Sequence, residues 1–476
     1  MRPGAALLTL GLAAMGPVHA QSGCGEGAGP EISVTNLSRN ETVGYELLLI
    51  KGDLAVTAEK VYLDLDGIPP GFPGSPSVEP DESAAAKPVR EWPAGGGHFK
   101  ALVQLAKGPN HIVLSAEGHR TTCLDVNYSP NPSRNTIRLV FVLSKDGMEG
   151  PGVIPAAPGD ISDLISAKKR LAFGALLMET AMAELLHDAG RPRRTVSFKR
   201  DSRGHVEVTV FHSARSEDSL RAKTADQLWE VFHRELDSAY QDGRTKFLSM
   251  LGGFGSGALG GGNQAMFGTA TLYSWAQGLD ELTSRFSDPR KPGDFNLVDE
   301  SAFRNSFWSN YSTGIGATLH ELGHALGLPH SGDGDDIMER GFDRFNRIFM
   351  IREDDQLITD QAAHYGPSSA DLLLNNAWVL PAAPAGLAAR EARVDYRLGR
   401  AGNRLALSMP GPGTVSLELY SPSGAKAATV FRGVLARGEH FFALPRLAPG
   451  IYFCAARADG RTDRNGGTAL ARILIP

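Results

Sequence analysis

Three histidines and one glutamate lie close together in the segment 320–330 of this 476-residue chain. His320 and His324 are one helical turn apart, so on a helix both imidazoles project from the same face. Gly327 can adopt the left-handed conformation that ends a helix, which lets the chain turn back and bring His330 to the same point. The segment therefore predicts a helix that ends near Gly327 beside a cluster of three histidine rings.

Three neutral imidazole nitrogens suit zinc, which accepts nitrogen ligands in tetrahedral geometry and leaves a fourth position open for water. Glu321 stands next to the first histidine, where its carboxylate can reach that water rather than the metal. Such a carboxylate acts as a general base and later returns the proton to a leaving amine. We therefore predict a Zn2+ centre held by His320, His324 and His330, with Glu321 as the catalytic base.

The alternative is a set of helix-surface histidines that bind no metal, because a bare His-Glu-x-x-His pattern also occurs by chance. The chain contains 55 Gly and 13 His among 476 residues. From composition alone, the chance that Gly and His also fall at the two further positions is about 1 in 300. The extended motif therefore favours the metal centre.

These residues are those of the metzincin zinc peptidases, and a second segment extends the resemblance. Asp336-Ile-Met-Glu-Arg resembles the turn that lies beneath the metal in that family, which gives Met338 a supporting role and not a ligand role. Two metzincin subgroups place a tyrosine ligand two residues after this methionine, but Arg340 stands there. The resemblance therefore implies peptide-bond hydrolysis at a zinc ion with three protein ligands.

Residues from about Gly44 to Ile348 resemble more narrowly a zinc-peptidase family of fungi and bacteria that has an N-terminal β-domain. The segments that carry this likeness are Trp92–Val103, Gly108–His111, Arg138–Asp146 and Gly260–Gly268. Some members end in a lectin domain, but the C-terminal region of this chain departs from them, so no lectin is inferred.

The same resemblance suggests that a strand near Gln264 to Tyr273 forms the upper edge of the cleft, where a peptide could add as an antiparallel strand. Met266 and Phe267 are then candidate substrate-binding residues. The alternative is an ordinary strand of the sheet.

The order of strand-like and helical patterns predicts several domains, since the chain is too long for one ordinary core. Short β-rich runs up to about Asp146 favour an immunoglobulin-like sandwich. Helical spacing from Ile161 to His187, with Asp160 as the expected N-cap, begins an α+β region. We expect an α+β metzincin-like catalytic domain flanked by two β-sandwich domains. The predicted boundaries are 1–20 signal peptide, 21–149 β-sandwich, 150–159 linker, 160–380 peptidase domain, 381–391 linker and 392–476 β-sandwich.

The first twenty residues combine Arg2, an apolar run and the ending Val18-His19-Ala20, which is typical of a secretory signal. No other segment is apolar for long enough to span a bilayer, so we expect a secreted or periplasmic protein. Export permits disulfides, and Cys24 could pair with Cys123, which would leave Cys454 alone; sequence does not decide the connectivity. The cysteine spacing does not suit a thiolate zinc site.

The chain has a net charge of −5, so it has no excess of positive charge that would attract a nucleic acid, and we expect no nucleic-acid partner.

The predicted function is that of a secreted zinc endopeptidase with a protein or peptide substrate. The β-sandwiches could also contact a cell surface or a polysaccharide, which leaves two alternatives open. One is a binding or adhesion protein with a non-catalytic zinc domain, and the other is a zinc hydrolase of a non-peptide amide. The intact Glu321 argues against the first, because a structural zinc site needs no base.

Overall fold

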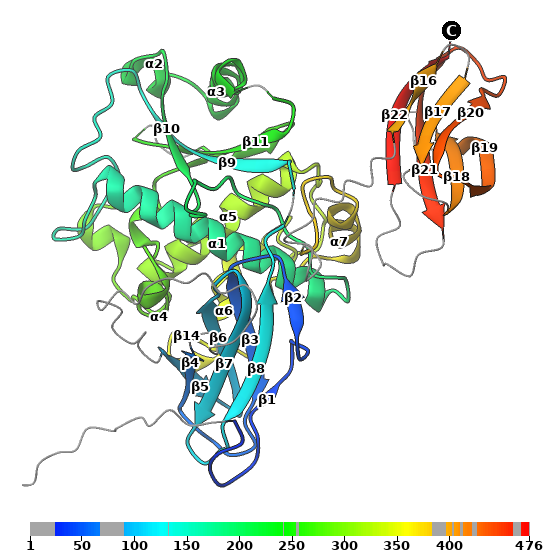
Figure 1. Cartoon of the computed structure of the whole chain (residues 1–476). Helices are drawn as coiled ribbons and strands as arrows, with labels where there is room; N and C mark the ends of the chain where they lie inside the picture. Colours follow the sequence, from blue (N-terminus) through cyan, green and yellow to red (C-terminus); the bar gives the residue numbers. More distant parts are fainter. Residues whose placement is uncertain are drawn as a thin grey trace, which may run out of the picture. The chain divides into compact units, whose positions relative to one another are not determined.

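The structure is a computed structural model that describes residues 24–66, 90–131, 133–240, 242–253, 257–382, 397–401, 404–409, 413–420, 426–459 and 468–475. The chain divides into two compact units, Met1–Ala385 and Gly386–Pro476 (Figure 1). The predicted signal peptide and most of the predicted linker 381–391 lie outside the described residues. Among the helices that are described, none is long and apolar enough to cross a membrane.

The first unit begins with a set of eight strands in the order β1-β3-β6-β5-β4-β7-β8-β2. Neighbouring strands are antiparallel, except that β2 pairs with β8 in parallel. The strands are β1 (Ser33–Val34), β2 (Glu41–Val43), β3 (Leu47–Asp53), β4 (Lys60–Asp66), β5 (Arg90–Gly95), β6 (His98–Gln104), β7 (Gly108–Ala116) and β8 (Thr122–Tyr128). That this part is an immunoglobulin-like sandwich stays a prediction.

A second sheet of five strands has the order β10-β9-β11-β13-β12. Pairing is parallel from β10 to β13, and only β12 is antiparallel to its neighbour. The strands are β9 (Thr136–Leu143), β10 (Val208–His212), β11 (Thr245–Leu251), β12 (Leu259–Gly261) and β13 (Gln264–Gly268). β9 thus connects a mainly antiparallel sheet to a mainly parallel one.

The position of β9 corrects the predicted domain boundary. The β-rich runs up to about Asp146 predict an N-terminal β-domain that ends at residue 149, whereas β9 lies inside the second sheet between β10 and β11. Its apolar run Ile-Arg-Leu-Val-Phe-Val-Leu is buried along nearly its whole length, as is usual for a parallel strand covered on both faces. A short apolar run does not show which sheet it joins, so the boundary was placed too late in the chain.

Helix α1 (Leu164–Asp188) agrees closely with the predicted helix 161–187. Its N-cap is Asp163, whose Oδ1 accepts a hydrogen bond from the Ser166 amide at 2.7 Å. The expected cap, Asp160, instead pairs with Arg290 at 3.1 Å. α1 contacts β3 of the first sheet and β9 and β10 of the second, and it runs between them in Figure 1. The helix is therefore buried around most of its circumference.

The remaining helices of this unit are mostly short. They are α2 (Glu217–Arg221), α3 (Ala225–Tyr240), α4 (Leu282–Arg285), α5 (Phe307–Ala325), α6 (Asn346–Phe349) and α7 (Pro367–Leu374), with 3-10 turns η1 (Leu272–Ser274), η2 (Leu279–Glu281), η3 (Pro292–Phe295) and η4 (Gly341–Arg344). β14 (Arg352–Glu353) and β15 (Gln356–Leu357) form a small hairpin. Of these, α5 carries the first part of the histidine motif.

Buried charged side chains join α1 to the first sheet. Glu184 of α1 has a fully buried side chain and accepts hydrogen bonds from Tyr45 Oη at 2.5 Å, Asn36 Nδ2 at 3.0 Å and Arg193 Nε at 2.8 Å. Arg193 Nη1 also reaches Glu41 at 2.6 Å. Burial and the adjacent Glu184 carboxylate hold the pKa of Tyr45 well above its usual value, so its hydroxyl remains a donor. The two layers are thus joined by a satisfied polar network as well as by apolar contacts.

The side chain of Lys100 on β6 has an unfavourable environment for a positive charge. Its Nζ donates to the Arg347 carbonyl of α6 at 2.5 Å. Burial, reinforced by nearby Lys51, lowers the pKa of Lys100 from 10.5 to about 7. Above pH 7 the folded chain therefore binds fewer protons at this site than the unfolded chain does.

This difference predicts a pH dependence of stability. Between the folded and unfolded pKa values of Lys100, the free energy of unfolding should rise with pH by up to about 1 kcal/mol per unit. The variant Lys100→Met should lose this slope and be more stable than the wild type near neutral pH. Urea unfolding at several pH values measures both effects, and equal slopes in the two proteins would contradict the prediction.

The second unit contains two antiparallel sheets, β16-β17-β20 and β19-β18-β21-β22. Their strands are β16 (Arg397–Ala401), β17 (Arg404–Met409), β18 (Gly413–Tyr420), β19 (Lys426–Leu435), β20 (Gly438–Ala443), β21 (Gly450–Asp459) and β22 (Thr468–Ile475). Residues of both sheets form one apolar core, which includes Leu407, Leu417 and the free, buried Cys454.

Candidate metal centre

Three imidazole rings converge at the end of α5. His324 Nε2 lies 3.0 Å from His320 Nε2 and 3.2 Å from His330 Nε2. Nitrogens that share one tetrahedral zinc ion at 2.0–2.1 Å stand about 3.4 Å apart. The three rings therefore fit a zinc ion with only small adjustments, and no other His, Cys, Asp or Glu of the described ranges completes this group.

The end of α5 positions the third ring. The Gly327 amide donates to the His324 carbonyl at 2.9 Å, and the Leu328 amide donates to the Gly323 carbonyl at 3.0 Å. Gly327 has φ of 90°, a left-handed conformation that glycine adopts without a steric penalty. The chain therefore reverses direction at this glycine and brings His330 back to the helix face.

Backbone carbonyls fix the protonation of two of the rings. His320 Nδ1 donates to the Ile337 carbonyl at 2.7 Å, and His324 Nδ1 donates to the Leu328 carbonyl at 2.8 Å. Since a carbonyl can only accept, the proton sits on Nδ1 and the lone pair on Nε2 faces the centre. Burial lowers the pKa of His320 to about 4, so this ring is neutral, as a metal ligand must be.

Met338 lies directly beneath the helix that carries the histidines and is fully buried. A Cβ at Gly323 would stand 2.3 Å from Met338 Sδ, so the glycine makes room for the methionine. The turn around Met338 is held by Asp336, whose Oδ1 accepts from the Met338 amide at 2.7 Å and whose Oδ2 accepts from Ser369 Oγ at 2.8 Å. The same turn presents the Ile337 carbonyl to His320.

Arg340 occupies the position where some metzincins have a tyrosine ligand. Its side chain pairs with Asp343 at 2.6 Å and lies over the Phe342 ring, 4.8 Å from the centroid. The Phe342 ring in turn contacts the His320 ring edge-on, with the centroids 5.1 Å apart. Arg340 is thus held beside the centre by other partners, and an arginine cannot lose its proton to become a ligand.

Glu321 follows His320 directly in α5, and the residue is buried, with an exposed fraction of 8%. Burial raises the pKa of the Glu321 carboxyl to about 7. A carboxyl whose pKa lies near neutrality can both accept and release a proton under ordinary conditions. The helix that carries His320 and His324 thus also carries a buried carboxyl group with a pKa near neutrality.

The candidate substrate strand differs from the expectation. The predicted strand extends from about Gln264 to Tyr273, but β13 ends at Gly268 and is followed by a turn and η1. β13 is hydrogen-bonded on one side to β11 and on the other to β12, so it has no free edge to which a peptide could add. Met266 is completely buried and Phe267 is 6% exposed. Both residues belong to the core, and β12 is the strand at the edge.

β12 lies directly on α5. A Cβ at Gly260 would come within 2.1 Å of the Glu321 carbonyl oxygen and 2.8 Å of His324 Cβ, so only glycine permits this approach. Gly260 belongs to a glycine-rich run over residues 252–262. This glycine lies against the backbone of the helix that carries His320 and His324.

This contact predicts that Gly260→Ala disturbs the centre. The added methyl should push β12 away from α5 and cost about 1–3 kcal/mol of stability, with a matching loss of metal affinity. Gly261→Ala is the matched control, because a Cβ there meets nothing within 4 Å. Thermal unfolding and metal titration compare the two variants, and equal behaviour would show that the close approach is unimportant.

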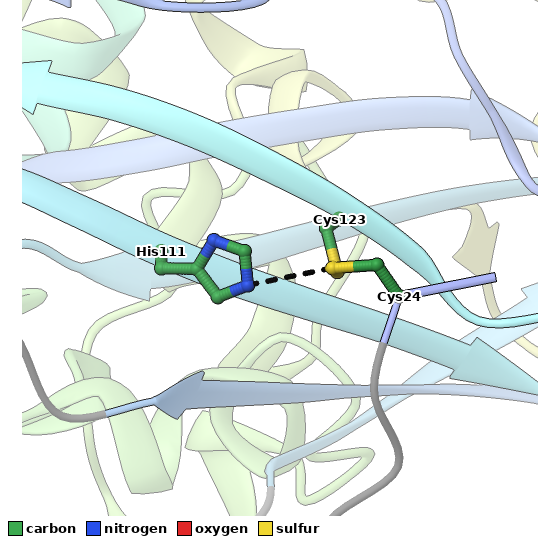
Figure 2. A group of neighbouring side chains, drawn as sticks. All are labelled: Cys24, His111 and Cys123. Atoms are coloured by element: carbon green, nitrogen blue, oxygen red, sulfur yellow. Dashed lines mark hydrogen bonds between the residues drawn. A yellow bond between two sulfur atoms is a disulfide. The ribbon is translucent and has the colours of Figure 1, made fainter. Parts of the chain in front are cut away.

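The two cysteines of the predicted pair are joined in the structure. Cys24 and Cys123 form a disulfide with Cα atoms 5.5 Å apart, which links residues separated by 99 positions in the sequence. Beside it lies His111, a residue that sequence analysis did not single out (Figure 2). The β7–β8 pairing brings the histidine to this place, and no local motif signals it.

Comparison with known proteins supports a peptidase assignment. A "Putative zinc metalloproteinase" of Schizosaccharomyces pombe is 26% identical over 357 residues, which is 68% of this chain and 54% of the yeast protein. One of Saccharomyces cerevisiae is 25% identical over 317 residues, which is 56% of this chain and 44% of that protein. The chain thus spans about half the length of the curated relatives it matches.

Solved structures show weaker similarity. OgpA of Akkermansia muciniphila has a TM-score of 0.35 and 13% identity, over 72% of this chain and 94% of OgpA. An archaemetzincin of Methanopyrus kandleri has a TM-score of 0.24 and 14% identity, over 51% of this chain and 96% of the archaemetzincin.

One family model spans both sheets and the histidine centre. It is Metallopep, described as "Putative peptidase family", and it matches residues 31–371. The matched part amounts to well over half of the chain, so this protein belongs to the Metallopep peptidase family.

Proposed function

We propose that this protein is an exported, zinc-dependent endopeptidase of the metzincin type. The observation that carries the proposal is the convergence of three Nε2 atoms at the end of the helix that also carries Glu321. On two of the rings, His320 and His324, the proton is fixed on Nδ1. This is the ligand set and the base that zinc-dependent peptide hydrolysis requires. The names of the two yeast relatives, both zinc metalloproteinases, support the choice of metal.

When bound, zinc supplies a Lewis acid that polarises the scissile carbonyl and acidifies a water molecule. In our proposal His320, His324 and His330 hold the metal, and Met338 supports them from below. Glu321 takes a proton from the attacking water and then gives it to the departing amine, which separates as the C–N bond breaks. The raised pKa of Glu321 suits both halves of this transfer.

The remaining parts of the proposal concern location and domain organisation. A signal sequence over residues 1–20 would direct export, and the Cys24–Cys123 disulfide supports an oxidising destination. We further propose that each flanking β-region forms a sandwich, and that these regions provide contacts to a cell surface or polysaccharide.

A peptide-library experiment tests the proposed activity. The mature protein is incubated with unmodified peptides and with acylated amines that are not peptides, and its zinc content is measured in parallel. We expect one bound zinc and cleavage within peptide chains, identified by mass spectrometry. Cleavage of only the acylated amines would favour a non-peptide amidase, and zinc binding without any cleavage would favour a binding protein.

A further inference from the structure

A second group of metal-ligating side chains lies on the first sheet, outside the histidine centre. Its members are Cys24, His111 and Cys123, whose ligand atoms all lie within 4.8 Å of one another. His111 Nε2 is 3.6 Å from Cys24 Sγ, and Figure 2 shows the ring directed at the sulfur of the disulfide. The fold therefore brings two sulfur atoms and one imidazole nitrogen together, although the spacing of the cysteines in the sequence does not suggest a thiolate site.

The strand register fixes this arrangement. His111 of β7 is directly opposite Asp125 of β8, and Val113 is opposite Cys123. Alternate residues of a strand face the same side of a sheet, so His111 and Cys123 are diagonal neighbours on one face. The group therefore depends on the β7–β8 pairing and not on the position of a flexible side chain.

Asp125 determines which nitrogen of His111 is available. The Asp125 carboxylate accepts a hydrogen bond from His111 Nδ1 at 2.6 Å. In the neutral ring the proton is then on Nδ1, and Nε2 presents a lone pair toward Cys24 Sγ. A disulfide sulfur carries no proton to donate to that lone pair. A histidine that binds zinc usually donates its other ring N–H to a carboxylate, as His111 does here to Asp125.

The cysteines would remain close together without the disulfide. The Gly25 amide donates to the Thr121 carbonyl at 2.9 Å, and the Thr121 amide donates to the Glu26 carbonyl at 2.9 Å. Thr121 Oγ1 also accepts from the Glu26 amide at 3.0 Å. These bonds fasten the segment after Cys24 to the start of β8, so reduction frees the two sulfurs without releasing the segment.

We propose that the reduced form of this protein binds a divalent, thiophilic metal ion of the zinc class through Cys24 Sγ, Cys123 Sγ and His111 Nε2. A dithiol or phosphine reductant supplies two electrons, the S–S bond breaks, two thiols form and the reductant is oxidised. Metal binding then displaces the two thiol protons into solvent and forms two metal–sulfur bonds and one metal–nitrogen bond. The disulfide form cannot bind the ion, so the site is controlled by redox state.

Cobalt substitution tests this proposal, because Co2+ bound by thiolates has a charge-transfer absorption that an all-histidine site lacks. The full chain is titrated with Co2+ before and after reduction with a phosphine. We expect the thiolate band only after reduction, together with one additional equivalent of bound zinc. The histidine centre gives no such band, so this result is independent of the proposed peptidase site.

His111→Ala provides the test of the ligand set, since it keeps both cysteines. It should weaken Co2+ binding to the reduced chain by at least about tenfold. The matched control is His98→Ala, because His98 is also paired with an aspartate, Asp53, on an exposed part of the sheet, but has no cysteine in its group. Circular dichroism monitors the fold of every reduced sample.

Three results would overturn the proposal. One is the absence of a thiolate band in a reduced chain that is still folded. Another is equal Co2+ affinity in His111→Ala and the wild type. The third is a chain that unfolds on reduction and does not regain its structure when Co2+ is added.

Discussion

Glu321→Gln is expected to lower the rate of peptide cleavage by about 100- to 10,000-fold while leaving zinc binding intact. Glutamine has nearly the same shape as glutamate but cannot accept a proton from water. The three histidine nitrogens and the carbonyls that orient them are unchanged by this substitution. Measurement of kcat/KM together with zinc stoichiometry separates loss of the base from loss of the metal.

Two further variants serve as controls for this result, one expected to lose zinc and one expected to change nothing. His324→Ala should lose both zinc and activity, because it removes the ring that lies closest to the other two. Glu230→Gln should change neither, since Glu230 lies on the surface of α3 and pairs there with Arg234 at 3.0 Å. If Glu321→Gln cleaves peptides at the wild-type rate, Glu321 is not the base.

Arg193→Met is expected to destabilise the first unit by about 3–5 kcal/mol. The substitution removes the guanidinium that lies 2.8 Å from Glu184 and 2.6 Å from Glu41. The Glu184 side chain is fully buried, so its charge is left without a cationic partner in a place that water does not reach. Urea unfolding followed by tryptophan fluorescence measures the loss.

A neighbouring arginine supplies the matched control. Arg191 pairs with Asp371 at 2.8 Å, but both side chains are about a third exposed or more. Arg191→Met should therefore cost less than about 1 kcal/mol. Adding Glu184→Gln to Arg193→Met should restore part of the lost stability, because it removes the uncompensated charge. Similar losses for Arg191→Met and Arg193→Met would contradict this account of the network.

Local sequence spacing is sufficient to predict that the three histidines converge, because they lie within one helix and the turn that follows it. His320 and His324 need only the helical repeat, and Gly327 explains the return of His330. The features that stabilise the centre are non-local. The Ile337 carbonyl that orients His320 comes from a separate turn, and the contact of Gly260 with α5 comes from the second sheet.

The pairing of strands within the sheets could not be predicted from the sequence. The limits of many strands follow from their apolar runs, but a run does not identify its neighbours in a sheet. For this reason the sequence places β9 in the wrong region. It also leaves open whether β13 is a cleft edge or an ordinary strand of the sheet, and the structure shows that β12 covers it. The grouping of His111 with Cys24 likewise depends on strand register, which no short motif in this chain encodes.

The burial of α1 between two sheets has a consequence for how this protein could have evolved. A helix that packs against two layers at once cannot be divided between two exchangeable modules, because either layer alone would leave the opposite apolar face of the helix exposed to water. Gene fusions and recombination should therefore join or lose the two layers together. By contrast, the C-terminal unit Gly386–Pro476 has its own core, so it should be gained or lost without disturbing the two layers around α1.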